Sequence, residues 1–523
     1  MQNQTKNVDI FVIGGGVNGC GIARDAVGRG YSVCLAEMND LASSTSSAST
    51  KLFHGGLRYL EYFEFRLVRE ALIEREILLR AMPHISWPMR FVLPFHKDMR
   101  FENDTPTSKL LSFIMPWTKG RRPAWLIRFG LFLYDHLGGR EILPGTTTVD
   151  LRTGPEGEPL VDKFERAFEY SDCWVEDSRL VVLNARDAKA KGADIRVQTK
   201  VVSATFKNDL WHVVTQNADG VEQTTIAKMI VNAGGPWVED IIRNTIQLKS
   251  TEGVRLVRGS HIVTKKMYDH DKCYFFQGED GRITFSIPYE DDFTLIGTTD
   301  AEHADLSEKP TCTPEESRYL IEFANKYFKQ KISDEDIVWS YSGVRPLYND
   351  GASSATAATR DYVLKVNHSA GGPVLNVFGG KITTYRRLAE SALELIDVEF
   401  KRKTTKWTAK ASMPGGDFPV TGVPALQDEL SKTLPFLPHK TIKRLIRQYG
   451  TEASSIFAGS TSLKDLGDDF GHGISQRELD WAIENEWVTE ADDFLWRRSK
   501  LGLRLNRNEI EKVSAYIADR MAE

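Results

Sequence analysis

The chain has 523 residues, of which 41% are hydrophobic and 27% charged, with a formal net charge of -5. Such a length exceeds one compact core, so we expect two or three units built around at least one large α/β domain. The composition excludes a globally disordered chain, and the small acidic surplus disfavours a general nucleic-acid-binding protein.

The cysteines and the N-terminus indicate an intracellular protein. The five cysteines are scattered and form no CxxC pair, which is typical of small buried thiols in a reducing compartment rather than of disulfides or a zinc site. The first residues, MQNQTKNVD, contain no secretory signal or transit peptide. No stretch reaches the roughly eighteen apolar residues of a membrane-spanning helix. We therefore expect a cytoplasmic protein whose membrane contact is peripheral or monotopic.

The chain opens with a nucleotide-binding pattern. Residues 8–13 form a short apolar, β-branched run that stops at a glycine cluster, and apolar residues then recur at helical spacing up to Gly28. This pattern predicts a strand, a tight turn and a helix whose free N–H groups face a pyrophosphate. The cluster has the GxGxxG spacing, formed by Gly14, Gly16 and Gly19, with Asn18 inside it. An ordinary βα turn is the alternative, and the loop alone does not separate NAD from FAD.

An acidic residue follows the second predicted strand. Residues 31–36 form that strand, and Glu37 comes directly after it, eighteen positions beyond Gly19. This is close to the spacing of the carboxylate that holds the adenosine ribose hydroxyls in dinucleotide-binding folds. The next segment, residues 43–56, is rich in small residues and is suited to lying along the pyrophosphate and ring of a flavin.

Two later segments favour FAD as the dinucleotide. Residues 229–237, MIVNAGGPW, have the pattern of the strand and small-residue turn by which two-domain flavoproteins return to the cofactor domain. Residues 374–378 form a strand-like run that leads into GGKITTY, residues 379–385. We expect this second segment to open a helix whose positive end faces the N1–C2=O edge of the flavin.

Longer motifs carry a resemblance to a known family. They are KLFHGGLRYL (51–60), EYSDCWVEDSRL (169–180), GSHIV (259–263), IGTTD (296–300), YSGVRPL (341–347), TRDY (359–362), FGGKITTYR (378–386), DLGDDFGHGISQRELDWAIENEW (465–487) and ADDFLWRR (491–498). With these motifs the chain resembles, nearly end to end, the aerobic, quinone-linked, FAD-dependent glycerol-3-phosphate dehydrogenases of bacterial type. The resemblance implies an α/β fold with a Rossmann-like FAD-binding domain of the glutathione-reductase-2/amino-acid-oxidase type. It also implies an interleaved α+β substrate cap and an all-α C-terminal domain.

The expected domain boundaries follow from that resemblance. The FAD-binding domain is assigned residues 1–82, 161–250 and 341–401, the substrate cap residues 83–160 and 251–340, and the helical C-terminal domain residues 402–523. Residues 83–160 also contain the candidate membrane-contact segment.

The resemblance further implies a reaction, the oxidation of sn-glycerol 3-phosphate to dihydroxyacetone phosphate. Hydride would pass to flavin N5 and the electrons onward to a membrane quinone. A phosphate dianion requires fixed cations, and the planar arginine side chain binds two of its oxygens at once. The expected substrate site comprises Arg58, Tyr59, Arg345, Arg360 and Lys381. For each arginine the ordinary alternative is a surface or salt-bridging side chain.

Two histidines are candidate bases, because imidazole takes up a proton near neutral pH. His54 and His261 both lie in glycine- or serine-flanked motifs, and a structural histidine is the alternative for each. Arg345 and Lys381 complete the expected catalytic set, since clustered cations lower the pKa of a nearby histidine and stabilise a developing alkoxide. On the resemblance, the expected FAD contacts are Gly14, Gly16, Asn18, Gly19, Glu37, Ser43, Ser46, Gly235, Gly379, Gly380, Lys381, Thr383 and Thr384.

Residues 95–121 form an insertion relative to the shorter bacterial family pattern. Apolar and aromatic side chains interleave with cations there, as at Trp117 and Lys119, and continue through Trp125. This composition is typical of an interfacial anchor on anionic lipid, here at the inner face of the cell membrane. A buried helix or a homodimer contact is the alternative.

Three other functions are alternatives to the dehydrogenase. A glycerol-3-phosphate oxidase would pass its electrons to O2, and a non-catalytic flavin-binding scaffold would recruit a partner through the helical C-terminus. A flavin amine oxidase would act on N-methyl amino acids. The amine oxidase is disfavoured by the paired arginines and by the C-terminal motifs, which match the phosphate-using family.

Overall fold

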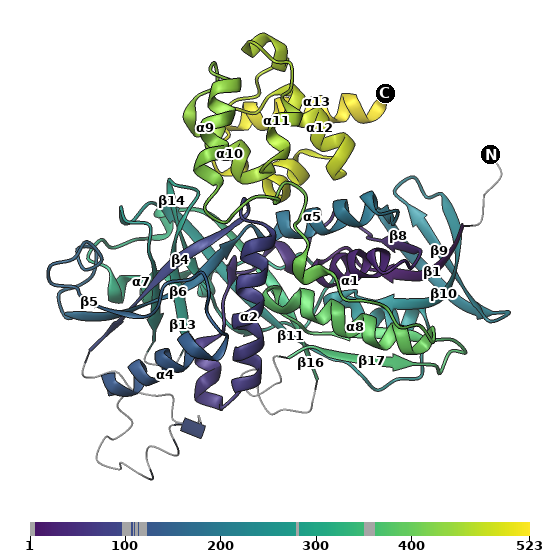
Figure 1. The fold of residues 1–523 in the computed structure, drawn as a ribbon, viewed down its shortest axis with the longest axis horizontal. Helices are drawn as coiled ribbons and strands as arrows, with labels where there is room; N and C mark the ends of the chain where they lie inside the picture. The colour runs from purple at the N-terminus through teal and green to yellow at the C-terminus, as the bar shows by residue number, and fades with distance from the viewer. Residues whose placement is uncertain are drawn as a thin grey trace.

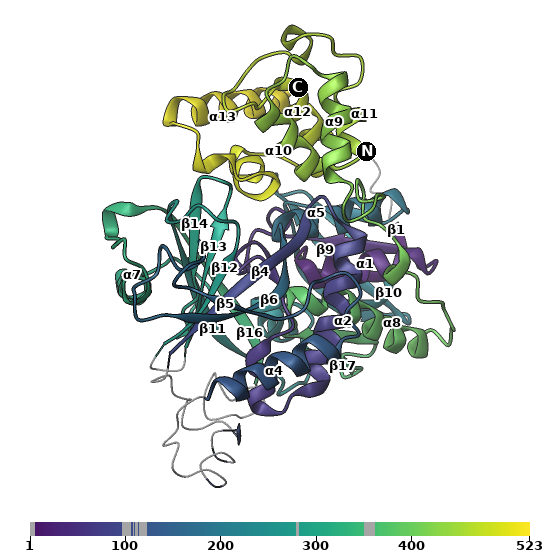
Figure 2. The same ribbon diagram turned by 60° about the vertical axis from the view of Figure 1, so that its left-hand side comes forward.

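The structure is a computed structural model that describes residues 6–96, 106, 107, 109, 113, 123–278, 282–349 and 361–523. Two β-sheets lie side by side in it, and a helical C-terminal domain sits above both (Figures 1 and 2). The chain passes between the two sheets several times, so strands that are distant in the sequence are neighbours in each sheet.

The first sheet has a parallel centre. Its strands are, in spatial order, β17 (Val363–Asn367), β18 (Val374–Phe378), β10 (Glu222–Asn232), β1 (Lys6–Ile13), β2 (Val33–Ala36) and β7 (Asp194–Arg196). β1 runs parallel to both β10 and β2, so the carboxyl ends of these strands meet at one edge of the sheet. In open parallel sheets this edge is where nucleotides bind.

Both faces of the parallel sheet are covered. One face carries α1 (Val17–Gly28), α5 (Asp177–Ala190) and α8 (Tyr385–Glu399), and the other carries β8 (Thr199–Lys207), β9 (Leu210–Asn217) and α6 (Val238–Asp240). Ile10 and Val12 pack toward the three helices, whereas Phe11 and Ile13 pack toward the β8–β9 hairpin. Because both faces are buried, β1 needs the nearly uninterrupted apolar run seen in the sequence.

The second sheet is mostly antiparallel. Its strands are, in order, β15 (Ala301–Glu302), β11 (Val254–Lys265), β14 (Phe293–Gly297), β13 (Ile283–Tyr289), β12 (Cys273–Gln277), β4 (Ser86–Phe95), β6 (Arg166–Val175) and β3 (Leu52–Phe53), with β16 (Ile337–Tyr348) on β11 and β5 (Thr147–Asp150) on β6. The helices that cover it are α2 (Phe65–Ala81) and α4 (Ala124–Leu137) on one face and α7 (Pro314–Tyr327) on the other.

The C-terminal domain is helical, as the motifs predicted. It contains α9 (Val423–Thr433), α10 (His439–Tyr449), α11 (Glu452–Ile456), α12 (Gln476–Glu486), a π-helical turn (Asp493–Arg498) and α13 (Arg507–Ala522). These helices have hydrophobic clusters of their own. The domain therefore has its own core, and it contacts the sheets through ion pairs, described below, and through ring stacking such as that of Trp496 on Trp339.

The structure confirms the expected fold class. The predicted strands at 8–13, 229–232 and 374–378 are found as β1, β10 and β18. β3, β6 and residues 341–348 of β16 fall in ranges assigned to the FAD-binding domain and lie in the second sheet. They do so because β3 pairs with β6, β6 with β4 and β16 with β11, all of them strands of that sheet.

Two further expectations concern membranes and thiols. Among the described residues, no helix has both the length and the apolar character needed to cross a bilayer. All five cysteines lie in the described part of the chain and none forms a disulfide. Four of them are buried, which agrees with their predicted role as small core side chains.

Candidate active site

A large cavity lies where the two sheets meet. Its volume is about 1140 Å³, more than the roughly 300–1,000 Å³ of a usual small-molecule site. The predicted residues that line it are Gly14, Gly16, Asn18, Glu37, Ser43, Ser46, His54, Arg58, Tyr59, Gly235, His261, Arg345, Gly379, Gly380, Lys381 and Thr383. The tertiary structure thus brings most of the predicted cofactor and substrate residues to one cavity.

Two predicted residues, Gly19 and Thr384, do not line the cavity. Gly19 lies one layer behind, where a Cβ atom would be only 1.9 Å from the carbonyl oxygen of Gly14. Thr384 is 2% exposed, and its N–H donates to the carbonyl oxygen of Lys381 at 3.0 Å. Arg360 falls outside the described residues.

Two glycines of the turn are required for different reasons, Gly14 for the fold and Gly16 for the approach of the cofactor. Gly14 has a φ of +109°, and a Cβ there would meet the carbonyl oxygen of Ala233 at 2.6 Å, so this position requires glycine for the fold itself. Gly16 is different, because a Cβ at that position would meet only the Ser46 hydroxyl, at 3.2 Å. The space in front of Gly16 belongs to the cavity, which is what the backbone needs to approach a pyrophosphate.

The loop after β2 is tied to this turn. One carboxylate oxygen of Glu37 accepts the N–H of Gly15 at 2.6 Å, and the other accepts the N–H of Asn39 at 2.9 Å. The Ser46 hydroxyl accepts the N–H of Val17, at the start of α1, at 3.0 Å. Burial raises the pKa of Glu37, and the backbone N–H donors oppose that rise. Glu37 therefore orders the turn while it lines the cavity.

The last cofactor segment closes the opposite wall. Gly379 and Gly380 both have positive φ values, +68° and +95°, and the Asn18 amide donates to the carbonyl oxygen of Gly379 at 3.1 Å. Lys381 then precedes the 3-10 turn that leads into α8. The two predicted glycine segments, more than 350 positions apart, are thereby joined directly.

Three cationic side chains line the cavity, those of Arg58, Arg345 and Lys381. Arg345 projects from β16, forms an ion pair with Asp300 and donates to the Thr298 hydroxyl at 3.1 Å. The Lys381 ammonium lies 3.8 Å from the centre of the Tyr59 ring, a cation–π distance. Arg58 lines the same cavity. Arg345 and Lys381 are thus each held by neighbouring side chains.

Both candidate histidines line the cavity, and both are held neutral. Desolvation lowers the pKa of His54 to about 4, helped by the charges of Lys381 and Arg75. His261 is 1% exposed, and desolvation, with Arg345 and Lys51, holds its pKa well below the ordinary value. Its Nε2 shares a hydrogen bond with the Thr50 hydroxyl at 2.9 Å, and the ring stacks on Tyr341 with centroids 4.7 Å apart. A neutral imidazole is the form that can accept a proton.

The low pKa of His54 predicts a pH effect on stability. Its folded pKa of about 4 lies below the unfolded value of 6.5, so the unfolded chain takes up a proton first as the pH falls from 6.5 to 4. Stability is therefore lost across that window, by up to about 3 kcal/mol. We expect His54→Gln to narrow the difference between the thermal midpoints of the apoprotein at pH 7 and pH 5. His136→Gln, at an exposed histidine, should leave the difference unchanged, and an unaltered difference in His54→Gln would contradict the assignment.

The sequence analysis missed several residues of the site. Asp300 and Thr298 line the cavity and hold Arg345, whereas the neighbouring Thr299 is buried and donates to Glu316 instead. Lys51 and Asp177 form a fully buried ion pair, and the Lys51 ammonium also lies over the Tyr341 ring. All of these residues except Glu316 lie inside motifs that were quoted for other residues, so the motifs marked the right segments but did not show the role of each residue in them.

Comparisons with known proteins agree with this geometry. A family model described as FAD dependent oxidoreductase matches residues 9–386, and one described as the C-terminal domain of alpha-glycerophosphate oxidase matches residues 406–523. The chain is 48% identical to a D-erythritol 1-phosphate dehydrogenase from Brucella abortus over 97% of each chain. It is 44% identical to the aerobic glycerol-3-phosphate dehydrogenase of Escherichia coli K12, over 98% of this chain and 97% of the relative. The chain belongs to the FAD-dependent glycerol-3-phosphate dehydrogenase family.

A solved relative supports both the cofactor and the fold. The crystal structure of the glycerol-3-phosphate dehydrogenase from Bacillus halodurans, complexed with FAD, aligns with a TM-score of 0.73 at 25% identity and covers 99% of this chain and 91% of that one. The residues of the present cavity fit FAD: an open Gly16, a helix N-terminus, the Glu37 carboxylate and the Gly379–Gly380 turn lie along it. The protein is an FAD-dependent oxidoreductase.

Proposed function

We propose that this enzyme oxidises sn-glycerol 3-phosphate to dihydroxyacetone phosphate and passes the electrons to a membrane quinone. The observation that carries the proposal is that the cofactor turn, Arg345, Lys381 and two neutral histidines share one cavity. Relatives of 46% and 44% identity, from Pseudomonas aeruginosa and Escherichia coli, are named glycerol-3-phosphate dehydrogenases.

The side chains suggest how the substrate is held. Arg345 and Lys381 supply fixed positive charge for the phosphate dianion, and Arg345 is already oriented by Asp300 and Thr298. His54 or His261, each neutral, accepts the proton of the substrate hydroxyl as the carbon is oxidised. Bound FAD supplies the hydride acceptor, flavin N5. The same cations lower the cost of developing negative charge on the substrate oxygen.

A longer polyol phosphate is the second candidate substrate. The Brucella abortus relative named D-erythritol 1-phosphate dehydrogenase is slightly more similar, at 48% identity, than the two named for glycerol 3-phosphate. Its substrate carries the same phosphate on a chain one carbon longer, and the cationic side chains of the cavity suit both.

Anaerobic titration of the holoenzyme with each phosphate ester tests the proposal. Glycerol 3-phosphate should bleach the flavin absorbance, and its kcat/KM should exceed that of D-erythritol 1-phosphate. The reverse order would make the longer ester the substrate, and failure of both to bleach would favour the non-catalytic scaffold. With air admitted, reduction of a quinone analogue should exceed peroxide formation, whereas peroxide in excess would make the protein an oxidase.

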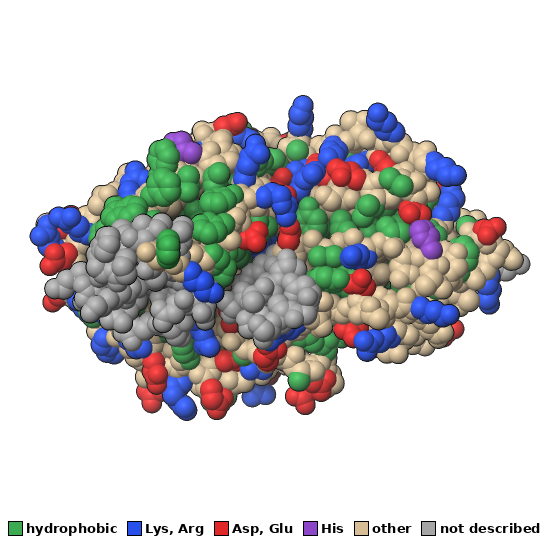
Figure 3. Space-filling model, turned by 90° about the horizontal axis from the view of Figure 1, so that it is seen from below, with side chains coloured by type: hydrophobic (Ala, Val, Ile, Leu, Met, Phe, Trp, Pro, Cys, Tyr) green, Lys and Arg blue, Asp and Glu red, His purple; other side chains and the backbone are tan. Residues whose placement is uncertain are grey.

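The membrane proposal concerns an apolar face around α4. Most of the predicted anchor, residues 97–105, 108, 110–112 and 114–121, lies outside the described residues. On its C-terminal side, Trp125, Phe129 and Phe132 project from α4 with 58%, 53% and 47% exposure. Three further aromatic residues are exposed. Phe63 lies just before α2 and Phe65 at its start, and Phe113 lies in the predicted anchor. Figure 3 shows hydrophobic side chains gathered on this lower face. An interfacial helix of this kind supports monotopic binding to the inner face of the cell membrane.

Vesicle binding tests the apolar face. Trp125→Glu with Phe129→Glu should abolish most cosedimentation with vesicles containing anionic lipid, because two charges would have to enter the headgroup region. Reduction of a soluble dye by glycerol 3-phosphate should stay within twofold of wild type. Val398→Glu, at a 72% exposed position on α8, is the control and should bind normally. Unchanged sedimentation of the double variant would refute the anchor. A homodimer remains a prediction, to be tested by light scattering in detergent.

A further inference from the structure

The loop that follows β2 faces the cofactor cavity on one side only. Glu37, Met38 and Asn39, and then Ala42 to Ser46, line the cavity. Asp40 does not line it, and the residue is 2% exposed. Its side chain is buried on the opposite side of the loop, where the C-terminal domain docks.

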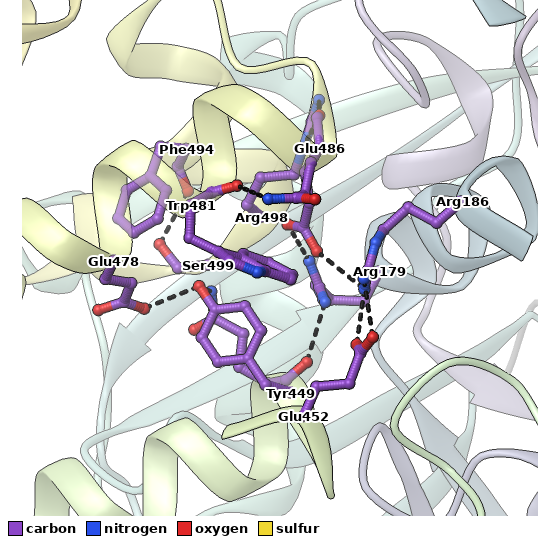
Figure 4. Close-up of polar contacts among 12 residues, drawn as sticks. Arg179, Arg186, Tyr449, Glu452, Glu478, Trp481, Glu486, Phe494, Arg498 and Ser499 are labelled. Atoms are coloured by element: carbon purple, nitrogen blue, oxygen red, sulfur yellow. Dashed lines mark hydrogen bonds and ion pairs between the residues drawn. The ribbon is translucent and has the colours of Figure 1, made fainter. Parts of the chain in front are cut away.

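Two arginines of the C-terminal domain hold the Asp40 carboxylate. Arg498 donates to both carboxylate oxygens, at 2.6 and 2.7 Å, and Arg497 donates through Nε at 2.5 Å. Arg498 is fully buried and also donates from Nε to the carbonyl oxygen of Glu486 at 2.9 Å. Figure 4 shows Arg498 among the polar contacts of this domain, close to Glu486. Such a buried, bidentate pair is strong only while both partners are present.

The same loop is under local constraint. Ala42 has a φ of +58°, a conformation that costs a non-glycine residue on the order of 1 kcal/mol or more. Its N–H donates to the carbonyl oxygen of Gly15 at 3.2 Å, and the N–H of Ser43 donates to the carbonyl oxygen of Asp40 at 3.2 Å. Asp40 therefore holds the loop on the side of the C-terminal domain. On the cavity side the loop is held by the hydrogen bonds between Glu37 and Gly15 and between Ser46 and Val17.

Without the arginines, Asp40 would not stay where it is. A buried carboxylate that loses its cation is left uncompensated, at a cost of several kcal/mol. Burial alone would raise the pKa of Asp40, and the two guanidinium groups outweigh it and lower that pKa. An unpaired Asp40 would turn toward water and release the tension on Ala42, so the loop would leave its cavity-lining conformation.

We propose that Arg498, assisted by Arg497, is a positioning residue for the cofactor, and that docking of the C-terminal domain holds loop 37–48 in the conformation that binds FAD. If docking of the C-terminal domain raises the affinity for FAD, the two equilibria share one coupling free energy. Bound FAD must then stabilise the docked C-terminal domain by the same amount. The inference concerns the cofactor and holds whichever polyol phosphate is oxidised.

A second ion pair at the same interface provides a matched control. Arg186 of α5 donates to Glu452 of α11 at 2.7 and 2.8 Å, so this pair also joins the C-terminal domain to the sheet domain (Figure 4). The hydrogen-bond and ion-pair partners of these two residues do not include any residue of loop 37–48. If these arginines only attach the C-terminal domain to the sheet domain, loss of the Arg498–Asp40 pair and loss of the Arg186–Glu452 pair should change the rate of FAD release equally.

The experiment measures release of FAD from the full-length holoenzyme by its fluorescence, together with amide exchange of loop 37–48. Arg498→Gln and Asp40→Asn should each speed FAD release at least tenfold and expose the loop amides to exchange. The double variant should be little worse than either single one, and Arg498→Lys, which keeps the charge and loses the bidentate geometry, should fall between. Glu452→Gln should stay within twofold of wild type.

Two results would overturn the proposal. One is an unchanged release rate in Asp40→Asn and Arg498→Gln, and the other is an equal acceleration in Glu452→Gln. If Arg498→Gln cannot be recovered folded, Arg497→Gln removes only the outer contact and should speed release about threefold, and no acceleration there would equally refute the coupling.

Discussion

Purified Gly16→Ala protein should be nearly colourless while remaining folded. A Cβ at this position would meet only the Ser46 hydroxyl, at 3.2 Å, and a hydroxyl at the end of a short side chain can shift by the few tenths of an ångström required. The methyl group would instead occupy the space through which the backbone approaches the pyrophosphate. We expect the dissociation constant for FAD to rise at least a hundredfold and the thermal midpoint of the apoprotein to change by no more than a few degrees.

Alanine variants of two other glycines serve as controls that distinguish loss of FAD binding from loss of folding. Gly130→Ala, in α4, also adds a methyl group where nothing lies within 4 Å, and it should retain FAD fully. Gly19→Ala places a Cβ 1.9 Å from the Gly14 carbonyl oxygen and should lower the thermal midpoint of the apoprotein itself. Normal flavin content in Gly16→Ala would show that the pyrophosphate does not lie against this residue.

Arg345→Ala should reduce kcat/KM about a hundredfold and leave FAD bound. A charge-assisted hydrogen bond to a phosphate stabilises by about 1.5–3 kcal/mol, and 1.4 kcal/mol corresponds to a factor of ten. The stability cost should be small, because the Asp300 carboxylate left behind is 35% exposed and can be hydrated. Arg345→Lys should recover part of the loss, since it restores the charge without the planar fork.

The control for Arg345 is an arginine on the neighbouring strand. Arg255 of β11 forms an ion pair with Glu302 and does not line the cavity, so Arg255→Ala should keep its kcat/KM within twofold. Flavin absorbance and the thermal midpoint should be measured for all three variants. An unchanged kcat/KM in Arg345→Ala, with flavin content normal, would remove Arg345 from the phosphate site.

The cofactor turn was determined by the sequence itself. A parallel strand buried on both faces must be apolar throughout, and the turn that follows it must place glycine where a Cβ would strike backbone. These are local requirements, so residues 8–19 and Glu37 could be predicted from spacing alone, and the structure places them as expected.

Only the tertiary structure decided which side chains act together. Arg345 and Asp300 lie 45 positions apart, and Arg498 and Asp40 lie 458 apart. Both pairs exist because strands and helices from separate parts of the chain happen to meet there. No periodicity or motif spacing records such a meeting, since each partner alone satisfies its own local pattern. The sequence therefore determined the nucleotide-binding turn and the kinds of residue in the site, whereas the packing of sheets and C-terminal domain determined the charge pairs that hold the site in place.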